Sequence, residues 1–164
     1  MVTALAISTP PLPPTAPSLI ISLFGSFKVT INGQPEALFR SNKARALFAY
    51  LVLAQAQPVL RTTLSELLWP DYQAESARVN LRQTLANLRD SLAPYELLYT
   101  DRHHVQLKLD PATIWCDVVL FSDLVTACQH HEHRSLHQCL SCQTRLQQAV
   151  ALYQGAFLEN FPNV

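Results

Sequence analysis

Long hydrogen-bonding side chains are concentrated in one stretch of the sequence, SARVNLRQTLANLRDSL, at residues 76–92. Asparagine and glutamine can pair through two hydrogen bonds with adenine in the major groove of DNA, and arginine can do so with guanine. Arginine also binds phosphates. The candidate DNA-binding residues are Arg78, Asn80, Arg82, Gln83, Asn87 and Arg89. Because the same residue types are common on helices that face only water, a solvated surface is the alternative.

The same stretch has the apolar spacing of an amphipathic helix. Its apolar residues recur every three or four positions and share one face. They are Ala77, Leu81, Leu85, Leu88 and Leu92. The opposite face is centred on Asn80, Gln83, Ala86 and Asn87. The arginines lie beside the apolar face, where phosphates are nearer than bases, although Arg78 could reach either because it is close to the helix start.

A second cluster of reactive side chains lies in CQHHEHRSLHQCLSC, at 128–142. Thiolates and imidazoles are the ligands that Zn²⁺ prefers; four are needed, and Cys-x-x-Cys supplies two of them. One closed set is Cys128, His133, Cys139 and Cys142. The cluster also contains His130, His131 and His137. Zinc would have a structural role there, and no cofactor is expected to be required for function.

Two other interpretations of this cluster stay open. Cys139 and Cys142 fall on the helical face of Leu146, Val150 and Tyr153, where free cysteines behave as small buried hydrophobes. The histidines would then form a polar loop. A redox switch is less favoured, because the sequence shows no neighbouring cation that lowers a thiol pKa.

The sequence before residues 76–92 predicts two strands and two helices. LIISLFGSFKVTING alternates as a strand does, and Asn32-Gly33 predicts a hairpin in which QPEALF returns. Ser41 is the candidate N-cap of a first helix. A short second helix is expected at 62–69, where Thr63 and Glu66 have capping-box spacing.

After 76–92, ELLYTDRHHVQLKLD predicts two strands joined by a polar turn. The resulting order of strand, strand, helix, helix, helix and hairpin is that of a winged helix-turn-helix. The turn carries Arg102, His103 and His104, where a wing would approach the minor groove. The histidines are largely neutral at pH 7, so only Arg102 is a candidate contact. A polar hairpin tip is the alternative.

Two more helices are predicted in TIWCDVVLFSDLVTACQ, with Asp117 as N-cap, and in LHQCLSCQTRLQQAVALYQG, ending at Gly155. Antiparallel helix pairs are the units of tetratricopeptide-like arrays. We therefore expect an α+β protein with a Pro-rich tail at 1–18, a winged-helix DNA-binding domain at 19–110 and a short helical segment at 111–164.

The overall composition limits the class of protein. With 164 residues, 49% of them hydrophobic, the chain can form a core of ordinary size, and its zero net charge requires any nucleic-acid surface to be local. It lacks the charged start of a secretory signal and any apolar run of the roughly 20 residues that span a bilayer. Four cysteines do not form a secreted disulfide framework. The chain also lacks a nucleophile–base arrangement, a glycine-rich phosphate loop and paired carboxylates. We expect a cytoplasmic, non-enzymatic protein without a membrane partner.

The ordered motifs resemble a known family. KARALFAYLVLAQAQPVLRTTLSELLWPDYQAESARVNLRQTLANLRDSL resembles the DNA-binding region of the Streptomyces antibiotic regulatory protein (SARP) family. LLYTDRHHVQLKL resembles its wing, and WCDVVLF with ALYQGAFLENF resembles the first helices of its bacterial transcriptional activation domain (BTAD). The resemblance spans about 19–161. Arg78, Asn80, Arg82 and Arg89 fall on matching motif positions.

The resemblance implies a response-regulator type of winged helix, followed by tetratricopeptide-like helices. It makes 76–92 the recognition helix, 62–69 the supporting helix and 98–109 the wing. It also implies double-stranded DNA with direct repeats and RNA polymerase as partners of a bacterial transcriptional activator. Because the net charge is zero, tight binding is expected to need a dimer on such repeats. A protein-interaction module without sequence-specific DNA binding is the alternative.

The sequence departs from the family pattern at three points. Leu60 stands where the family usually has serine, so Thr62 or Thr63 is expected to cap the second helix. The wing turn DRHH lacks the usual glycine. The family's activation domain continues well beyond this length, which is expected of a fragment or of a short regulator.

Overall fold

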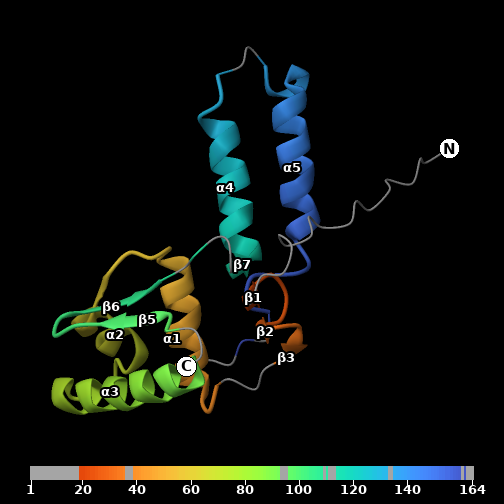
Figure 1. The fold of residues 1–164 in the computed structure, drawn as a ribbon. Helices are drawn as coiled ribbons and strands as arrows, with labels where there is room; N and C mark the ends of the chain where they lie inside the picture. The colour runs from red at the N-terminus through yellow and green to blue at the C-terminus, as the bar shows by residue number, and fades with distance from the viewer. Residues whose placement is uncertain are drawn as a thin grey trace. The chain divides into compact units, whose positions relative to one another are not determined.

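The structure is a computed structural model that describes residues 19–35, 39–92, 96–108, 110, 114–132, 135–159 and 161. The expected tail at 1–18 lies outside these residues. The described residues form two compact units, one made of 19–34 with 114–161 and the other of 35–110 (Figure 1). The N-terminal strands at 19–34 therefore belong with the C-terminal helices and not with the expected winged-helix domain at 19–110, whose end at 110 lies next to the boundary between the units.

The unit at 35–110 consists of three helices and a small antiparallel sheet. The elements are α1 (Asn42–Leu53), β4 (Val59–Leu60), α2 (Arg61–Leu68), α3 (Ala74–Ser91), β5 (Leu98–Thr100) and β6 (His104–Leu107), and the sheet has the order β4-β6-β5. Its largest fully buried side chain is Phe48, which lies in the core on α1 together with Leu47 and Leu51. Trp69 is also buried.

The predicted N-caps of the helices in this unit agree with the structure only in part. Ser41 caps α1 as predicted, because its hydroxyl accepts a hydrogen bond from the backbone N–H of Ala44 at 3.2 Å. The predicted threonine cap of α2 is wrong. Leu60 occupies the N-cap position without a side-chain hydrogen bond, and the carbonyl of Thr62 accepts a bond from the Ser65 hydroxyl. Pairing of β4 with β6 places the chain for α2 instead.

The other unit combines a four-stranded sheet with two helices. Its elements are β1 (Leu19–Ser22), β2 (Lys28–Ile31), β3 (Gln34–Pro35), β7 (Ile114–Cys116), α4 (Asp117–Gln129), a 3-10 helix η2 (Leu136–Gln138) and α5 (Leu140–Leu152). Asn32 and Gly33 have φ angles of 47° and 77°, which the tight turn between β2 and β3 requires. The predicted hairpin is thus confirmed. Its returning strand is short, and residues 36–38 lie outside the described part.

Strand β7 is the main element that local patterns did not predict. Residues 114–116 were expected only to lead into a helix capped by Asp117, but they pair in parallel with β1, in the sheet order β3-β2-β1-β7. The chain returns to β1 after the whole intervening unit. The N-cap position of α4 is Cys116, so the predicted N-cap is displaced by one residue. Tyr153 is the C-cap of α5, so that helix ends at Leu152 rather than at Gly155. None of the described helices is both long enough and apolar enough to cross a bilayer.

Candidate nucleic-acid interface

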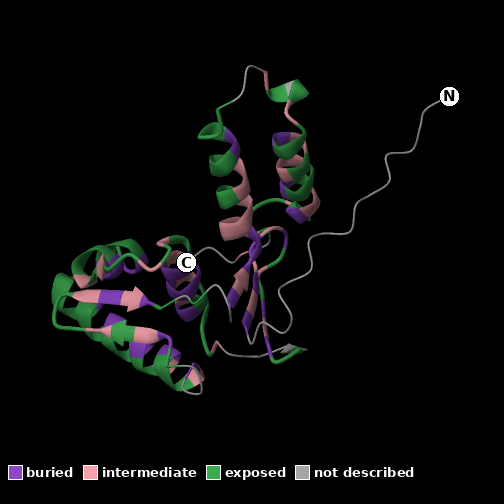
Figure 2. Cartoon of the chain, turned by 45° about the horizontal axis from the view of Figure 1, so that its top comes forward, coloured by how far each residue is buried: buried purple, intermediate pink, exposed green. Residues whose placement is uncertain are grey.

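Helix α3 has two chemically distinct faces. Ala77, Leu81, Leu85 and Leu88 have at most 3% of their surface exposed, as the periodicity predicted. Each leucine buried in this way stabilises the unit by roughly 1.5–3 kcal/mol. Figure 2 shows that buried and exposed positions alternate along α3, as expected for a helix with one buried and one exposed face. The buried face fixes which side of α3 is presented to solvent.

The polar positions of α3 lie on the solvent side. Arg78, Arg82, Gln83, Ala86 and Arg89 are exposed. The two asparagines of the set, at 80 and 87, are half-buried. The structure therefore gathers the predicted residues of α3 on one helix but does not give them equal freedom to reach a ligand.

Some of these side chains already have partners within the protein. Arg78 lies 3.6 Å from the carboxylate of Glu75, but both side chains are more than half exposed, so the ion pair contributes little to stability. The Gln83 amide donates to Asn87 at 3.3 Å. Within the described part of the chain, Arg82 has neither an ion pair nor a hydrogen bond. Arg82 is thus the most available cation on α3.

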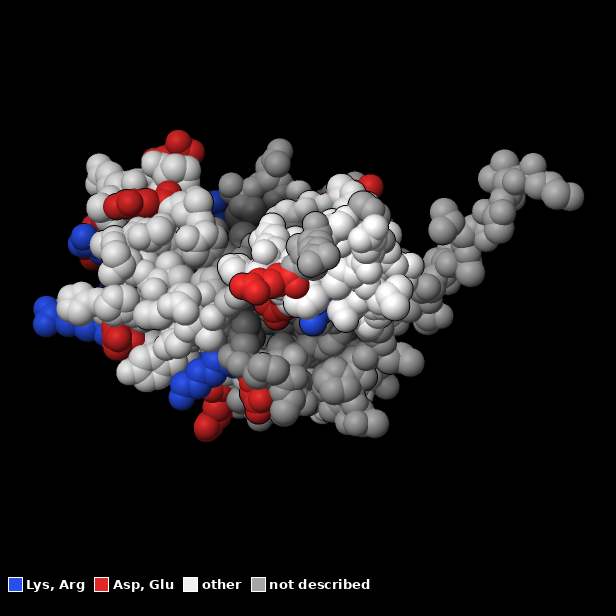
Figure 3. Space-filling view, turned by 90° about the horizontal axis from the view of Figure 1, so that it is seen from above, with Lys and Arg blue, Asp and Glu red and all other residues white. Residues whose placement is uncertain are grey.

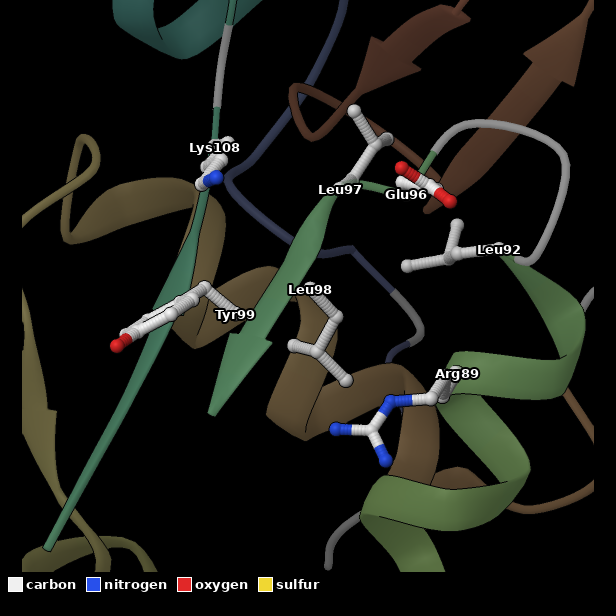
Figure 4. A pocket seen from close by; sticks show the side chains of 7 residues that line it. All are labelled: Arg89, Leu92, Glu96, Leu97, Leu98, Tyr99 and Lys108. Atoms are coloured by element: carbon white, nitrogen blue, oxygen red, sulfur yellow. The ribbon is translucent and has the colours of Figure 1, made fainter. Parts of the chain in front are cut away.

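Arg89 connects α3 to the hairpin. Its Nη2 donates to the hydroxyl of Thr100 on β5 at 2.6 Å. Figure 4 shows the guanidinium extending from α3 toward β5. A surface hollow of about 440 Å³ lies here, and it is also lined by Leu98, Tyr99 and Lys108. Arg89 therefore has a positioning contact that sequence spacing did not reveal.

The turn between β5 and β6 is held by a carboxylate. Asp101 accepts hydrogen bonds from the backbone N–H groups of His103 and His104, both at 2.7 Å. The Asp101 N–H donates to the His104 carbonyl at 3.1 Å. These bonds close the predicted hairpin without the glycine that the family pattern has at this point. Sequence reasoning missed this role, although an aspartate at the first turn position is its usual signal.

Arg102 stands at the tip of this hairpin. Its side chain is exposed, and in the described residues it makes no ion pair or hydrogen bond. The backbone N–H of Arg61 donates to the carbonyl of His103 at 2.8 Å, which ties the turn to the start of α2. Arg102, the predicted contact residue, therefore lies on a turn that hydrogen bonds hold in place.

We expect the Asp101 turn to weaken in acid. Hydrogen bonds from the backbone N–H of His104, and then of His103, lower the pKa of Asp101 below its ordinary value of 3.8. Its stabilising contribution is complete above pH 3.8 and is lost as the pH falls through the lower folded pKa. The NMR shifts of the two histidine amide protons should titrate with a midpoint below 3.8, and Asp101→Asn should remove this step. A midpoint at or above 3.8 would contradict the assignment.

The positive charges are local rather than continuous. On the face shown in Figure 3, basic atoms lie in small groups beside acidic ones. The side chain of Lys43 donates to the carbonyl of Leu68 and lies 5.6 Å from the centre of the Trp69 ring. It is therefore engaged in stabilising the end of α2. Arg45 is exposed on α1.

The cysteine and histidine cluster lies in the other unit. His131, Cys139 and Cys142 offer ligand atoms within 4.8 Å of one another, so they form a group that could hold a metal. His133 of the predicted set, and the side chain of His137, lie outside the described residues. Cys128 is buried beside this group, with its Sγ 3.7 Å from the Cys142 carbonyl oxygen. Among the described residues, the histidine that lies beside the two thiols is therefore His131.

The fold is similar to a solved structure of Mycobacterium tuberculosis EmbR in complex with a low-affinity phosphopeptide. The TM-score is 0.66 and the identity 25%, over 86% of this chain. The chain spans 37% of the length of that EmbR chain. No family model and no curated protein matches the sequence. The similarity to EmbR supports a fold of the SARP type for this α+β chain.

Proposed function

We propose that this protein is a transcriptional regulator that binds double-stranded DNA in a sequence-specific way and catalyses no reaction. The observation that carries the proposal is the division of α3 into a buried leucine face and an exposed face of arginine and glutamine. The similarity of fold to EmbR supports a regulatory role. In this proposal the unit at 35–110 is a cytoplasmic winged helix-turn-helix domain.

The dimensions of α3 suit the major groove. An α-helix fits this groove, and the 18 residues of α3 extend over about 27 Å. The Arg89–Thr100 bond connects α3 to the hairpin, so both elements can approach DNA together. The hairpin then takes the place of a wing, with Arg102 at the minor groove.

Each side chain has a distinct role in this proposal. Arg78 and Arg82 contact phosphates on either side of the groove, which fixes the position of α3 without reading sequence. Gln83 and Asn87 read bases, because a side-chain amide pairs with adenine through two hydrogen bonds. Their mutual hydrogen bond leaves each amide with further donor and acceptor capacity, because an amide NH₂ has two donors and its oxygen can accept two bonds. Arg89 acts through its hydrogen bond to Thr100, which holds α3 against β5.

The proposal is tested by selecting bound sequences from a random double-stranded DNA pool at near-physiological salt. We expect one enriched motif, and because the chain has no net charge we expect tight binding to need two copies on repeats about 10–11 base pairs apart. Gln83→Ala should relax the preference at one motif position, where a lost bidentate contact costs roughly 1–3 kcal/mol of discrimination. The exposed residue Gln73, which precedes α3, provides the matched control Gln73→Ala. Failure of the folded protein to enrich any motif would favour a protein-interaction module instead.

A further inference from the structure

The far end of the α4–α5 hairpin brings sulfur and nitrogen atoms together. The Nδ1 of His131 lies 3.1 Å from the Sγ of Cys142 and 3.4 Å from the Sγ of Cys139. In a tetrahedral zinc site, nitrogen and sulfur ligands are separated by about 3.5 Å, because the Zn–N and Zn–S bonds are about 2.0 and 2.3 Å long. An ion would need to lengthen these two nitrogen–sulfur separations by only a few tenths of an ångström.

A fourth ligand is available within the same hairpin. Cys128, on the last turn of α4, is buried, and its Sγ contacts the carbonyl of Cys142. Cys128 lies outside the group whose ligand atoms are all within 4.8 Å of one another, so its thiol must move toward the other three atoms when an ion binds. The set of three thiols and one imidazole is a usual structural zinc set.

The surroundings also suit a charged cluster. Zn²⁺ with three thiolates and a neutral imidazole carries one negative charge. Arg145 follows Cys142 by three positions on α5, so the two side chains lie on the same side of the helix. In the described structure, Nη1 of Arg145 is buried without a hydrogen-bond partner. A metal–thiolate cluster would give this guanidinium group a counter-charge, as outer groups around metal ligands do.

We propose that Cys128, His131, Cys139 and Cys142 bind one zinc ion in a tetrahedral site. The ion joins the C-terminal end of α4 to the N-terminal end of α5 and fixes the connection that includes η2. Its role is structural, because the four protein ligands leave no open position for a substrate. The site is separate from α3 and does not depend on the proposed DNA binding.

The first test is the metal content of the full chain, produced without a polyhistidine tag and kept reduced. We expect about one equivalent of zinc by elemental analysis, and Co²⁺ in its place should give the visible absorption of tetrahedral thiolate coordination. Removing zinc with a chelator should lower the melting temperature of the protein. Less than about a tenth of an equivalent after incubation with Zn²⁺, or a Cys139–Cys142 disulfide in zinc-supplied protein, would overturn the proposal.

The matched variants are His131→Ala and His130→Ala. Both histidines are exposed, so neither replacement should disrupt the core, and His130 instead lies with its Nδ1 2.9 Å from the Thr126 carbonyl. We expect His131→Ala to weaken zinc binding by more than about 100-fold, because loss of a ligand exceeds loss of an outer group. His130→Ala should bind zinc as the parent does. Equal zinc affinities for the two variants would refute the role of His131.

Discussion

Replacing Arg78 and Arg82 together with alanine is expected to weaken binding to every DNA sequence by on the order of 60-fold at about 0.1 M salt. Each phosphate contact releases about 0.9 counterion, which is worth about an eightfold change in affinity at this salt concentration. The plot of log affinity against log salt should therefore become shallower by about 1.8. Fluorescence anisotropy with a labelled duplex, measured over a salt series, gives both quantities.

Three further variants show whether the loss comes from phosphate contacts. Lys28→Ala removes one exposed charge from β2, in the other unit, and should leave the salt slope unchanged. Glu75→Gln removes the carboxylate that pairs with Arg78, and it should strengthen binding. Arg89→Ala should weaken binding mainly by loosening α3 from β5, with a smaller change in slope than Arg82→Ala. A slope that is the same for the parent and the Arg78/Arg82 variant would refute the proposed phosphate contacts.

Asp117→Ala is expected to lower the free energy of unfolding by about 3 kcal/mol. The Asp117 side chain is 3% exposed and accepts hydrogen bonds from the backbone N–H groups of Leu23 and Phe24, at 2.9 and 3.0 Å. It also accepts one from Val118 at 2.7 Å, at the start of α4, where the helix dipole favours a carboxylate. Alanine would leave the buried Leu23 donor unpaired, and that accounts for most of the cost.

Chemical denaturation and amide hydrogen exchange measure this effect. Exchange of the Leu23 amide should accelerate in Asp117→Ala, because its acceptor is gone. The exposed Asp123, also on α4, provides the control Asp123→Ala, for which we expect a change within about 0.5 kcal/mol. If both variants unfolded at the same denaturant concentration as the parent, the hydrogen bonds of Asp117 that connect the end of β1 to the start of α4 would not stabilise the protein.

The candidate interface was largely predictable because its signals are local. The leucine repeat of 76–92 has the helical period, so it determined both the helix and its buried face. Asn32-Gly33 and Ser41 act within three residues of themselves, and both predictions are confirmed. The availability of individual side chains was not predictable in this way, since the partner of Arg89 comes from a different element.

The sequence by itself determined the periodic helices, the two hairpins and the residue types on the polar face of α3. Only the tertiary structure decided which distant segments meet: β1 pairs with β7, Asp117 accepts bonds from the end of β1, and His131 joins the thiols of Cys139 and Cys142. The physical reason is that helix and turn signals act within a few residues, whereas these contacts join segments whose separation leaves no periodic trace in the sequence. The thiol–imidazole group combines both cases, because its residue types were visible in the sequence but its histidine was selected by the geometry of the α4–α5 hairpin.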